Sequence, residues 1–220
     1  MSAPPAIVCA DLHAEPAWHG LNLVVQPGEC AVVAGNGRGK FRLLQLLLGQ
    51  AKRQFGRLEV LGQDPSALSR RQLNRLRTQC VLAPHNGAVV ANMSIWDNVA
   101  LPLRYHGLCP ESEARDRVDA ALSALELAAI GSQRPAVLVP EQQRLVSIAR
   151  LVAQRLHVML VQDPYEGLDE GMADRVHAQL TERVQAWAAC LLTTQVSGVD
   201  RAYDGRIADL VGSHVIHHTE

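Results

Sequence analysis

The sequence reads A-G-N-G-R-G-K-F-R from Ala34 to Arg42, directly after an apolar run that ends at Val33 and directly before a leucine-rich segment that begins at Leu43. A strand, a glycine-rich turn and a helix are the context that a phosphate-binding loop requires. The glycines let backbone N–H groups point inward, the helix N-terminus adds partial positive charge, and Lys40 is long enough to reach the outer phosphates of a nucleotide. The candidate nucleotide-binding residues are therefore Ala34, Gly35, Asn36, Gly37, Arg38, Gly39, Lys40, Phe41 and Arg42.

One position departs from this loop chemistry. The residue after the lysine is normally Ser or Thr, whose hydroxyl holds Mg²⁺, and here it is Phe41. The ring either fills the space of the metal and the last phosphate or packs in the core, and both interpretations stay open. Arg38 and Arg42 make the loop basic, so arginine could replace metal charge and allow an anion or a nucleotide to bind without Mg²⁺. The alternatives are that Arg42 faces solvent and that the loop binds no ligand.

Composition sets the class of protein. The chain has 220 residues, of which 48% are hydrophobic and 20% charged, with a formal net charge of −1. This predicts a soluble fold of one domain or two closely joined lobes, with no general attraction to nucleic acid. The five cysteines are scattered, which is typical of free thiols in a reducing compartment. No apolar run reaches the ~18 residues of a membrane span, and the N-terminus does not read as a signal peptide.

The apolar pattern alternates between strand and helix. Short apolar runs predict strands over residues 6–12, 21–26, 30–34, 57–61, 80–83, 157–161 and 190–194, and near Ile207 and Val215. Helical spacing predicts helices over 39–48, 66–77, 111–127, 141–154 and 171–187 and a helical turn after Ser94. Asp64 or Ser66 is the expected cap of the second helix. The sequence thus predicts an α/β core (1–84 and 155–220) with flanking helices, an antiparallel β flank and an inserted helical subdomain (85–154).

The stretch from Asn86 to His106 reads N-G-A-V-V-A-N-M-S-I-W-D-N-V-A-L-P-L-R-Y-H. This segment and the order of landmarks resemble an ABC transporter ATP-binding subunit over nearly the whole chain, most of all the ATPase of Mla-type phospholipid transporters. The resemblance implies a P-loop NTPase fold. It also implies that the protein is located in the cytoplasm, at the inner face of the cell membrane. It also implies docking on a membrane-embedded transporter subunit and pairing with itself or with another ATPase subunit. The family's docking segment corresponds here to Val89, Val90, Met93 and Trp96, with core burial of Trp96 as the alternative.

The resemblance assigns catalytic positions one at a time, and most have changed type. The glutamine that contacts Mg²⁺ falls at His85, and the aspartate that anchors Mg²⁺ through water falls at Gln162. A neutral imidazole, as at His85, is a poor ligand for Mg²⁺. The glutamate that activates water falls at Asp163, and the histidine that contacts the last phosphate falls at Gln195. If the family's pattern is instead aligned one residue later, which is the alternative register, Asp163 anchors the metal and Pro164 takes the place of the base.

The signature loop, L-S-G-G-Q in the family, falls at Leu138, Val139, Pro140, Glu141 and Gln142. The serine is lost, Pro140 has no N–H to donate, and Glu141 brings negative charge towards phosphate. The family's adenine-stacking aromatic falls nearest to His13, with Trp18 as the second candidate.

Phosphoryl transfer needs metal charge and a positioned water, so we expect little or no ATP hydrolysis. We also expect no resident metal, and ATP bound without Mg²⁺ as the only cofactor. The function expected from these positions is that of a structural or regulatory subunit. The alternatives are a slow ATPase that drives transport of phospholipid or another solute, and a soluble nucleotide-sensing module.

Overall fold

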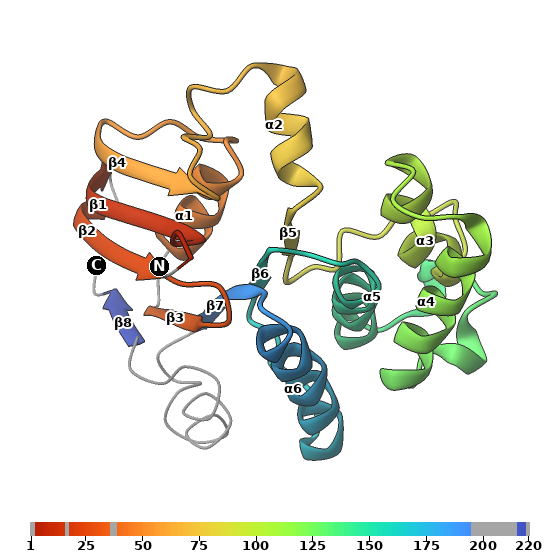
Figure 1. Cartoon of the computed structure of the whole chain (residues 1–220). Coiled ribbons are helices and arrows are strands. Elements are labelled where there is room, and N and C mark those ends of the chain that lie inside the picture. The colour runs from red at the N-terminus through yellow and green to blue at the C-terminus, as the bar shows by residue number, and fades with distance from the viewer. Residues whose placement is uncertain (1–2, 16–17, 36–38, 195–214, 219–220) are drawn as a thin grey trace. The chain divides into compact units, whose positions relative to one another are not determined.

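The structure, a computed structural model, describes residues 3–15, 18–35, 39–194 and 215–218. The chain divides into two compact units. Figure 1 shows the whole chain, coloured by residue number from red at the N-terminus to blue at the C-terminus. The sheet unit comprises residues 1–82, 156–162 and 184–220, and the helical unit comprises residues 83–155 and 163–183. The helical unit therefore takes in 163–183, a segment that the sequence analysis placed with the α/β core.

Three strands of the sheet unit form an antiparallel sheet in the order β2-β1-β4. They are β1 (Ile7–Ala14), β2 (Trp18–Val25) and β4 (Phe55–Val60). Along β2, Trp18, Leu21, Leu23 and Val25 are buried while residues between them are exposed, as a sheet with one covered face requires. The predicted antiparallel flank is confirmed.

The second sheet has the order β5-β6-β7-β3-β8. Its strands are β3 (Cys30–Gly35), β5 (Cys80–Ala83), β6 (Val158–Gln162), β7 (Ala189–Thr194) and β8 (Val215–His218). β3 runs parallel to β7 and β8, and β6 runs parallel to β7. β7 is buried throughout, which explains its unbroken apolar run. Because these strands are parallel, their carboxyl ends lie at one edge, where Ala34 is opposite Thr194 and Gln162 is opposite Thr193.

Two helices of the sheet unit are α1 (Gly39–Leu47) and α2 (Arg70–Arg77). The prediction that α2 starts at Ser66 with Asp64 or Ser66 as its cap is wrong. Ser69 caps this helix, because its hydroxyl accepts from the Gln72 N–H while the Gln72 side chain accepts from the Ser69 N–H at 3.0 Å. Asp64 instead binds the Arg53 guanidinium at 2.7 and 2.9 Å and accepts from the Ser66 N–H at 2.9 Å. A carboxylate used in this way cannot cap the helix.

The helical unit contains α3 (Ile95–Tyr105), α4 (Glu111–Ala124), α5 (Pro140–Val152) and most of α6 (Glu170–Gln185). Two short 3₁₀ turns, Ala128–Ile130 and Pro135–Val137, join α4 to α5. The apolar positions at helical spacing are buried, including Val99, Val118 and Ile148. The predicted helices and strands are present, with ends that differ by a few residues, and the strand predicted near Ile207 lies outside the described residues. No helix in the described part of the chain is long and apolar enough to cross a membrane.

Candidate functional site

The strand and the helix predicted on either side of the phosphate-loop glycines are both present. β3 ends at Gly35 and α1 begins at Gly39, and Ala34 is completely buried in β3. Lys40 lies in the first turn of α1 and is only 6% exposed. A lysine buried at a helix N-terminus lies where a phosphate group would be held. The predicted site residues Asn36, Gly37 and Arg38 lie outside the described part of the chain.

Phe41 is 44% exposed, so the ring does not pack in the core of the sheet unit. The core-packing interpretation of this residue is therefore wrong. Arg42 is held rather than free in solvent, because its Nη2 donates to the Lys52 carbonyl at 3.2 Å. Its Nε is buried and has no hydrogen-bond acceptor among the described residues. A partly buried cation thus lies two residues after the lysine.

The two aromatic candidates for adenine stacking differ in position. Trp18 is 4% exposed, and its indole N–H donates to the Gly39 carbonyl at 2.9 Å, so it has no open face for a base. The His13 ring stacks on Phe55 with centroids 3.8 Å apart and an interplanar angle of 23°. Phe55 is 56% exposed. An aromatic surface is therefore present at His13 and Phe55, of which only His13 was predicted from the sequence.

The end of β6 determines what stands at the metal-anchor and base positions. Gln162 is the last residue of the strand, and Asp163 follows it with a φ of +46° and 6% exposure. A neutral amide therefore closes the strand, and the buried carboxylate comes one residue later. The choice between Gln162 and Asp163 for the metal-anchor position stays a prediction. Gln195, the predicted position of the phosphate-sensing histidine, lies outside the described residues.

In the helical unit, His85 is held against α5. The Arg144 Nε donates to the His85 carbonyl at 3.3 Å, and Arg144 Nη2 lies 3.4 Å from the His85 Nε2. On the other side of the ring, the His85 Nδ1 lies 3.4 Å from the Glu166 Oε2. One side-chain nitrogen or oxygen atom of each of His85, Asp163 and Glu166 lies within 4.8 Å of the others. His85 and Asp163 were each predicted from the sequence, whereas Glu166 was not.

The signature-loop residues form the N-terminus of α5. Leu138 is buried, Val139 is 53% exposed, and Pro140 is the first residue of the helix. The Gln142 side chain accepts from the Val139 N–H at 3.2 Å and so caps the helix internally. Glu141 projects towards Gly167, where an added Cβ would lie 3.0 Å from its Oε1. A helix start whose first residue is Pro offers fewer N–H groups to a phosphate.

The predicted docking segment is organised by Asn98, which is completely buried. The Asn98 Oδ1 accepts from the Val90 N–H at 2.7 Å, and its Nδ2 donates to the carbonyls of Val90 and Ser94 at 3.1 and 2.9 Å. Nδ2 also lies 3.4 Å from the Met93 carbonyl. Arg150 of α5 donates to the Asn98 carbonyl at 2.9 Å, and burial lowers the pKa of this guanidinium. These bonds hold the loop that carries Val89, Val90 and Met93.

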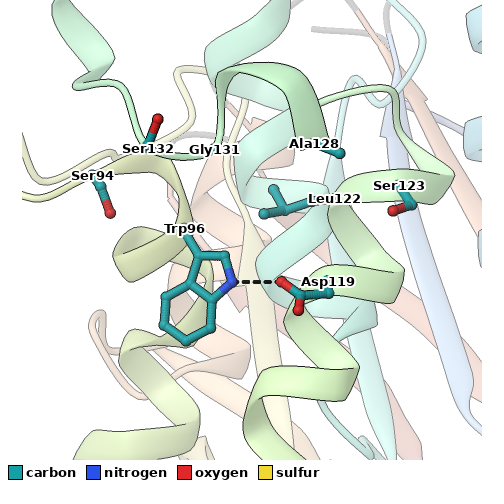
Figure 2. Close-up of a pocket in the computed structure, with 8 residues that line it drawn as sticks. All are labelled: Ser94, Trp96, Asp119, Leu122, Ser123, Ala128, Gly131 and Ser132. Atoms are coloured by element: carbon teal, nitrogen blue, oxygen red, sulfur yellow. Dashed lines mark hydrogen bonds between the residues drawn. The ribbon is translucent and has the colours of Figure 1, made fainter.

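Trp96 lines a pocket of about 670 Å³ in the helical unit (Figure 2). Its indole N–H donates to the Asp119 carboxylate at 2.7 Å, and the ring is partly exposed. Core burial of Trp96, the alternative interpretation, is therefore wrong. The pocket combines an apolar floor with hydroxyl groups and one carboxylate. The lining residues are Ser94, Trp96, Asp119, Leu122, Ser123, Ala128, Gly131 and Ser132.

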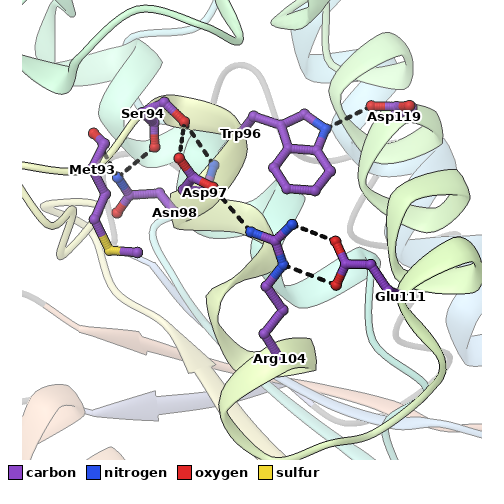
Figure 3. Close-up of polar contacts among 8 residues, drawn as sticks. All are labelled: Met93, Ser94, Trp96, Asp97, Asn98, Arg104, Glu111 and Asp119. Atoms are coloured by element: carbon purple, nitrogen blue, oxygen red, sulfur yellow. Dashed lines mark hydrogen bonds and ion pairs between the residues drawn. The ribbon is translucent and has the colours of Figure 1, made fainter.

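Arg104 supports the other side of the indole (Figure 3). Its guanidinium carbon lies 4.7 Å from the Trp96 ring centroid, a cation–π distance. The same guanidinium pairs with Asp97 at 3.1 Å and with Glu111, and this pairing lowers the pKa of the Glu111 carboxyl. Trp96 is thus fixed on both sides by polar groups that the sequence analysis did not assign.

Three residues of the site were missed from the sequence for different reasons. Glu166 lies in the turn between β6 and α6, where acidic residues are ordinary. Arg144 occurs among charged and apolar residues of α5, and nothing in its spacing marks it as buried. Asn98 had the best signal, because it belongs to the D-N-V-A run that carries the family resemblance.

A parallel sheet with a phosphate loop at its carboxyl edge, beside an antiparallel sheet, and a helical unit carrying the signature segment define the class of P-loop ATPase cassettes. The ABC transporter family model matches residues 18–166, so the chain belongs to the ABC transporter family.

Two curated relatives and one solved structure illustrate the match. The Haemophilus influenzae phospholipid transport ATP-binding protein MlaF is 32% identical over 153 residues, covering 69% of this chain and 58% of that protein. The Escherichia coli K12 cell division protein FtsE is 30% identical over 179 residues, covering 81% of this chain and 80% of that protein. The dimeric ATP-binding cassette MJ0796 bound to ADP and Pi has a TM-score of 0.81 at 20% identity, covering 97% of this chain and 94% of that one.

The predicted ABC ATPase-like fold is thereby confirmed. The matched segment spans little more than half of MlaF, and FtsE is matched over a larger share of both chains. The relatives therefore support membership of the family in general more strongly than membership of the Mla type.

Proposed function

We propose that this chain is an ABC-cassette subunit that hydrolyses little or no ATP and docks on a membrane-embedded transporter subunit, or on another ATPase subunit, as a structural or regulatory component. The observation that carries the proposal is the end of β6, where Gln162 stands at the position of the family's metal-anchoring aspartate. A carboxamide brings no charge to a divalent cation. The buried carboxylate that follows, Asp163, is one methylene shorter than the family's base.

The residues present do not fit Mg²⁺. This ion demands near-ideal octahedral oxygen coordination and keeps most of its waters. Phe41, at the position of the metal-holding hydroxyl, offers a half-exposed hydrocarbon ring. Gln162 and His85, at two further positions of the family's metal ligands, likewise bring neither an anionic oxygen nor a hydroxyl. These parts act as a unit in phosphoryl transfer, so their joint loss should remove nearly all of the rate.

A nucleotide site without hydrolysis is the second part of the proposal. The features that support it are the buried Lys40 at the start of α1 and the partly buried Arg42 beside it. Arginine is always charged and offers planar donors to phosphate, so it can replace part of the metal's charge. The stacked rings of His13 and Phe55 add a surface for a base. We therefore expect ATP to bind in the absence of Mg²⁺.

Docking is supported by the contrast between segments. The candidate docking residues Val89, Val90, Met93 and Trp96 keep the family's residue types, and the buried Asn98 holds their loop in one conformation. The catalytic positions have lost theirs. A protein retained for docking alone would show this distribution. The setting that follows is the cytoplasmic face of the cell membrane.

A slow ATPase that moves phospholipid or another solute is the second candidate. Lys40 and the Asp163 carboxylate favour it, because a lysine and a shortened base could support slow hydrolysis. The similarity to MlaF favours phospholipid as the substrate in that case. In either case the docking surface is the same, so the rate of hydrolysis distinguishes the two candidates.

The test is a comparison of ATP affinity and phosphate release with Mg²⁺ and with EDTA, in wild type and Lys40→Ala. We expect ATP binding that is indifferent to Mg²⁺ and weakened by Lys40→Ala, with no phosphate release above the level of the variant. Mg²⁺-dependent phosphate release that disappears in Lys40→Ala would establish the slow ATPase instead. Absence of ATP binding in every condition would remove the nucleotide part and leave docking to be tested alone.

A further inference from the structure

We propose that His85, Asp163 and Glu166 form a binding site for a divalent transition-metal ion, with Zn²⁺ as the best-fitting member of the class. The site lies entirely within the helical unit, and it goes beyond the proposed function because it requires no nucleotide. It also differs from the expectation of a chain without a resident metal. One ligand atom from each of the three side chains lies within 4.8 Å of the other two.

The spacing of two of these atoms already suits coordination. In a tetrahedral site with bonds of about 2.0–2.1 Å, neighbouring ligand atoms lie about 3.4 Å apart. The His85 Nδ1 and the Glu166 Oε2 are separated by 3.4 Å. An oxygen of the Asp163 carboxylate lies within 4.8 Å of both, so the three side chains must draw closer together to coordinate one ion.

The His85 Nδ1 faces Glu166 at 3.4 Å. The Arg144 Nη2 lies 3.4 Å from the His85 Nε2, and because arginine only donates, this contact must give way when Nε2 carries the proton of the metal-bound imidazole. The backbone of the same loop is tied to α5, because Arg144 Nε donates to the His85 carbonyl at 3.3 Å and Ser147 Oγ donates to the Pro84 carbonyl at 3.2 Å. A ligand fixed by a second layer of contacts loses little conformational freedom when a metal binds.

The charge at this place also favours a cation. Asp163 is 6% exposed, and an oxygen of the Glu166 carboxylate lies within 4.8 Å of one of its own, so two acids are brought together here. A divalent ion among His85, Asp163 and Glu166 would neutralise both acids at once. It would also bind the one imidazole nitrogen that faces them.

The ligand set selects the metal. Imidazole with carboxylates suits Zn²⁺, Mn²⁺ and Fe²⁺, whereas Mg²⁺ prefers oxygen ligands alone. Three protein ligands leave a fourth position for water or for an oxygen of a bound molecule. The family's glutamine is histidine at position 85. This histidine weakens a magnesium site and provides one ligand for a transition-metal site.

The test is calorimetric titration of the full chain with ZnCl₂ alone and with MgCl₂ alone, without nucleotide. The background carries His214→Asn, His217→Asn and His218→Asn, so that these C-terminal histidines do not bind the probe. We expect about one Zn²⁺ per chain with Mg²⁺ at least ~100-fold weaker. His85→Asn and Glu166→Gln should each weaken Zn²⁺ binding by at least about tenfold.

His106→Asn is the matched control, because His106 is an exposed histidine of the same unit. It should leave Zn²⁺ binding unchanged. Circular dichroism melting of each variant shows whether the fold is kept, and Glu166→Gln changes only one exposed group and should remain folded. Zn²⁺ binding that survives both His85→Asn and Glu166→Gln, or no binding below millimolar Zn²⁺, would overturn the site. Neither result depends on whether ATP binds or is hydrolysed.

Discussion

The carboxamide of Asn98 exchanges two hydrogen bonds with the backbone of Val90, accepting from its N–H at 2.7 Å and donating to its carbonyl at 3.1 Å. A single buried side chain therefore substitutes for a backbone partner and closes the loop between Gly87 and Ser94. The candidate docking residues Val89, Val90 and Met93 all lie on this loop. Its conformation thus depends on one residue that no transporter partner would touch.

Asn98→Ala should destabilise the helical unit by about 2–4 kcal/mol, because it leaves several buried backbone groups without partners. Urea unfolding followed by circular dichroism measures the change. Asn92→Ala, at an exposed position of the same loop, is the control and should change stability by less than about 0.5 kcal/mol. Equal effects of the two substitutions would contradict the role given to Asn98.

Gly87 allows close approach of the same loop to α5. Its φ is +73°, and an added Cβ would lie 2.2 Å from the carbonyl oxygen of Gln143. Gly87→Ala should therefore cost at least about 2 kcal/mol, since both the backbone conformation and the contact must change. Gly107 also has a positive φ, +59°, but nothing lies within 4 Å of its added Cβ. Gly107→Ala should cost only about 1 kcal/mol, so a Gly87 variant as stable as the Gly107 variant would refute the close contact.

The parts of the fold that sequence predicted well are those fixed by local pattern. The strand Cys80–Ala83 was predicted at its observed bounds, and α1 begins at Gly39, where the glycine pattern predicted it. The cap of α2 was missed because Asp64 is engaged by Arg53, which lies eleven residues away in the sequence. Capping preferences consider only neighbouring residues, so they do not take into account that Arg53 binds Asp64.

Outside the phosphate loop, the candidate site was predictable only where the family resemblance assigned a position. His85 and Asp163 were named in this way, but their proximity to Glu166 depends on chain folding. Arg144 contacts His85 across 59 residues of sequence, and no spacing rule joins them. At Phe41 the sequence shows that the expected hydroxyl is missing, but whether the ring is buried or exposed is known only from the structure.

The Arg53–Asp64 pair predicts a pH dependence of stability. Hydrogen bonds from Arg53 hold the pKa of Asp64 at about 2, below the ordinary 3.8. Because the folded-state pKa is the lower one, the pair stabilises the fold at pH values above about 4, and this stability is lost as the pH falls towards about 2. Asp64→Asn should remove about 1–2 kcal/mol at neutral pH, after allowance for solvent screening.

Urea unfolding at a series of pH values measures this contribution of the Arg53–Asp64 pair. The difference in unfolding free energy between wild type and Asp64→Asn should shrink as the pH falls below about 4. Asp116→Asn, at an exposed position on α4, serves as the control. A difference that stays constant down to pH 2 would show that the loss is not electrostatic.

The pocket beside Trp96 predicts how a partner is held. Trp96→Ala removes the wall between Asp119 and Arg104, and aromatic residues at pocket walls often dominate binding. Recovery of a membrane protein from solubilised membranes by the tagged chain should fall at least about tenfold in this variant. Tyr105→Ala, which removes a 79% exposed ring outside the pocket, should leave recovery unchanged. Unchanged recovery with Trp96→Ala would move docking away from this pocket.

Restoring the metal-binding side chains tests the proposal that ATP binds without Mg²⁺. The combined variant Phe41→Ser, Gln162→Asp and Asp163→Glu returns a hydroxyl, an anchoring carboxylate and a full-length base to the family's positions. ATP affinity measured with Mg²⁺ and with EDTA should be equal in wild type and at least about tenfold tighter with Mg²⁺ in the variant. Phosphate release should stay low, because Pro140 and Glu141 of the signature loop are unchanged and would face the partner's nucleotide.

Phe41→Ala, which removes the ring without adding a hydroxyl, separates relief of crowding from metal coordination. If Phe41→Ala alone produced the full Mg²⁺ dependence, the lost ligands at positions 41 and 162 would not be the reason that wild type is indifferent to Mg²⁺.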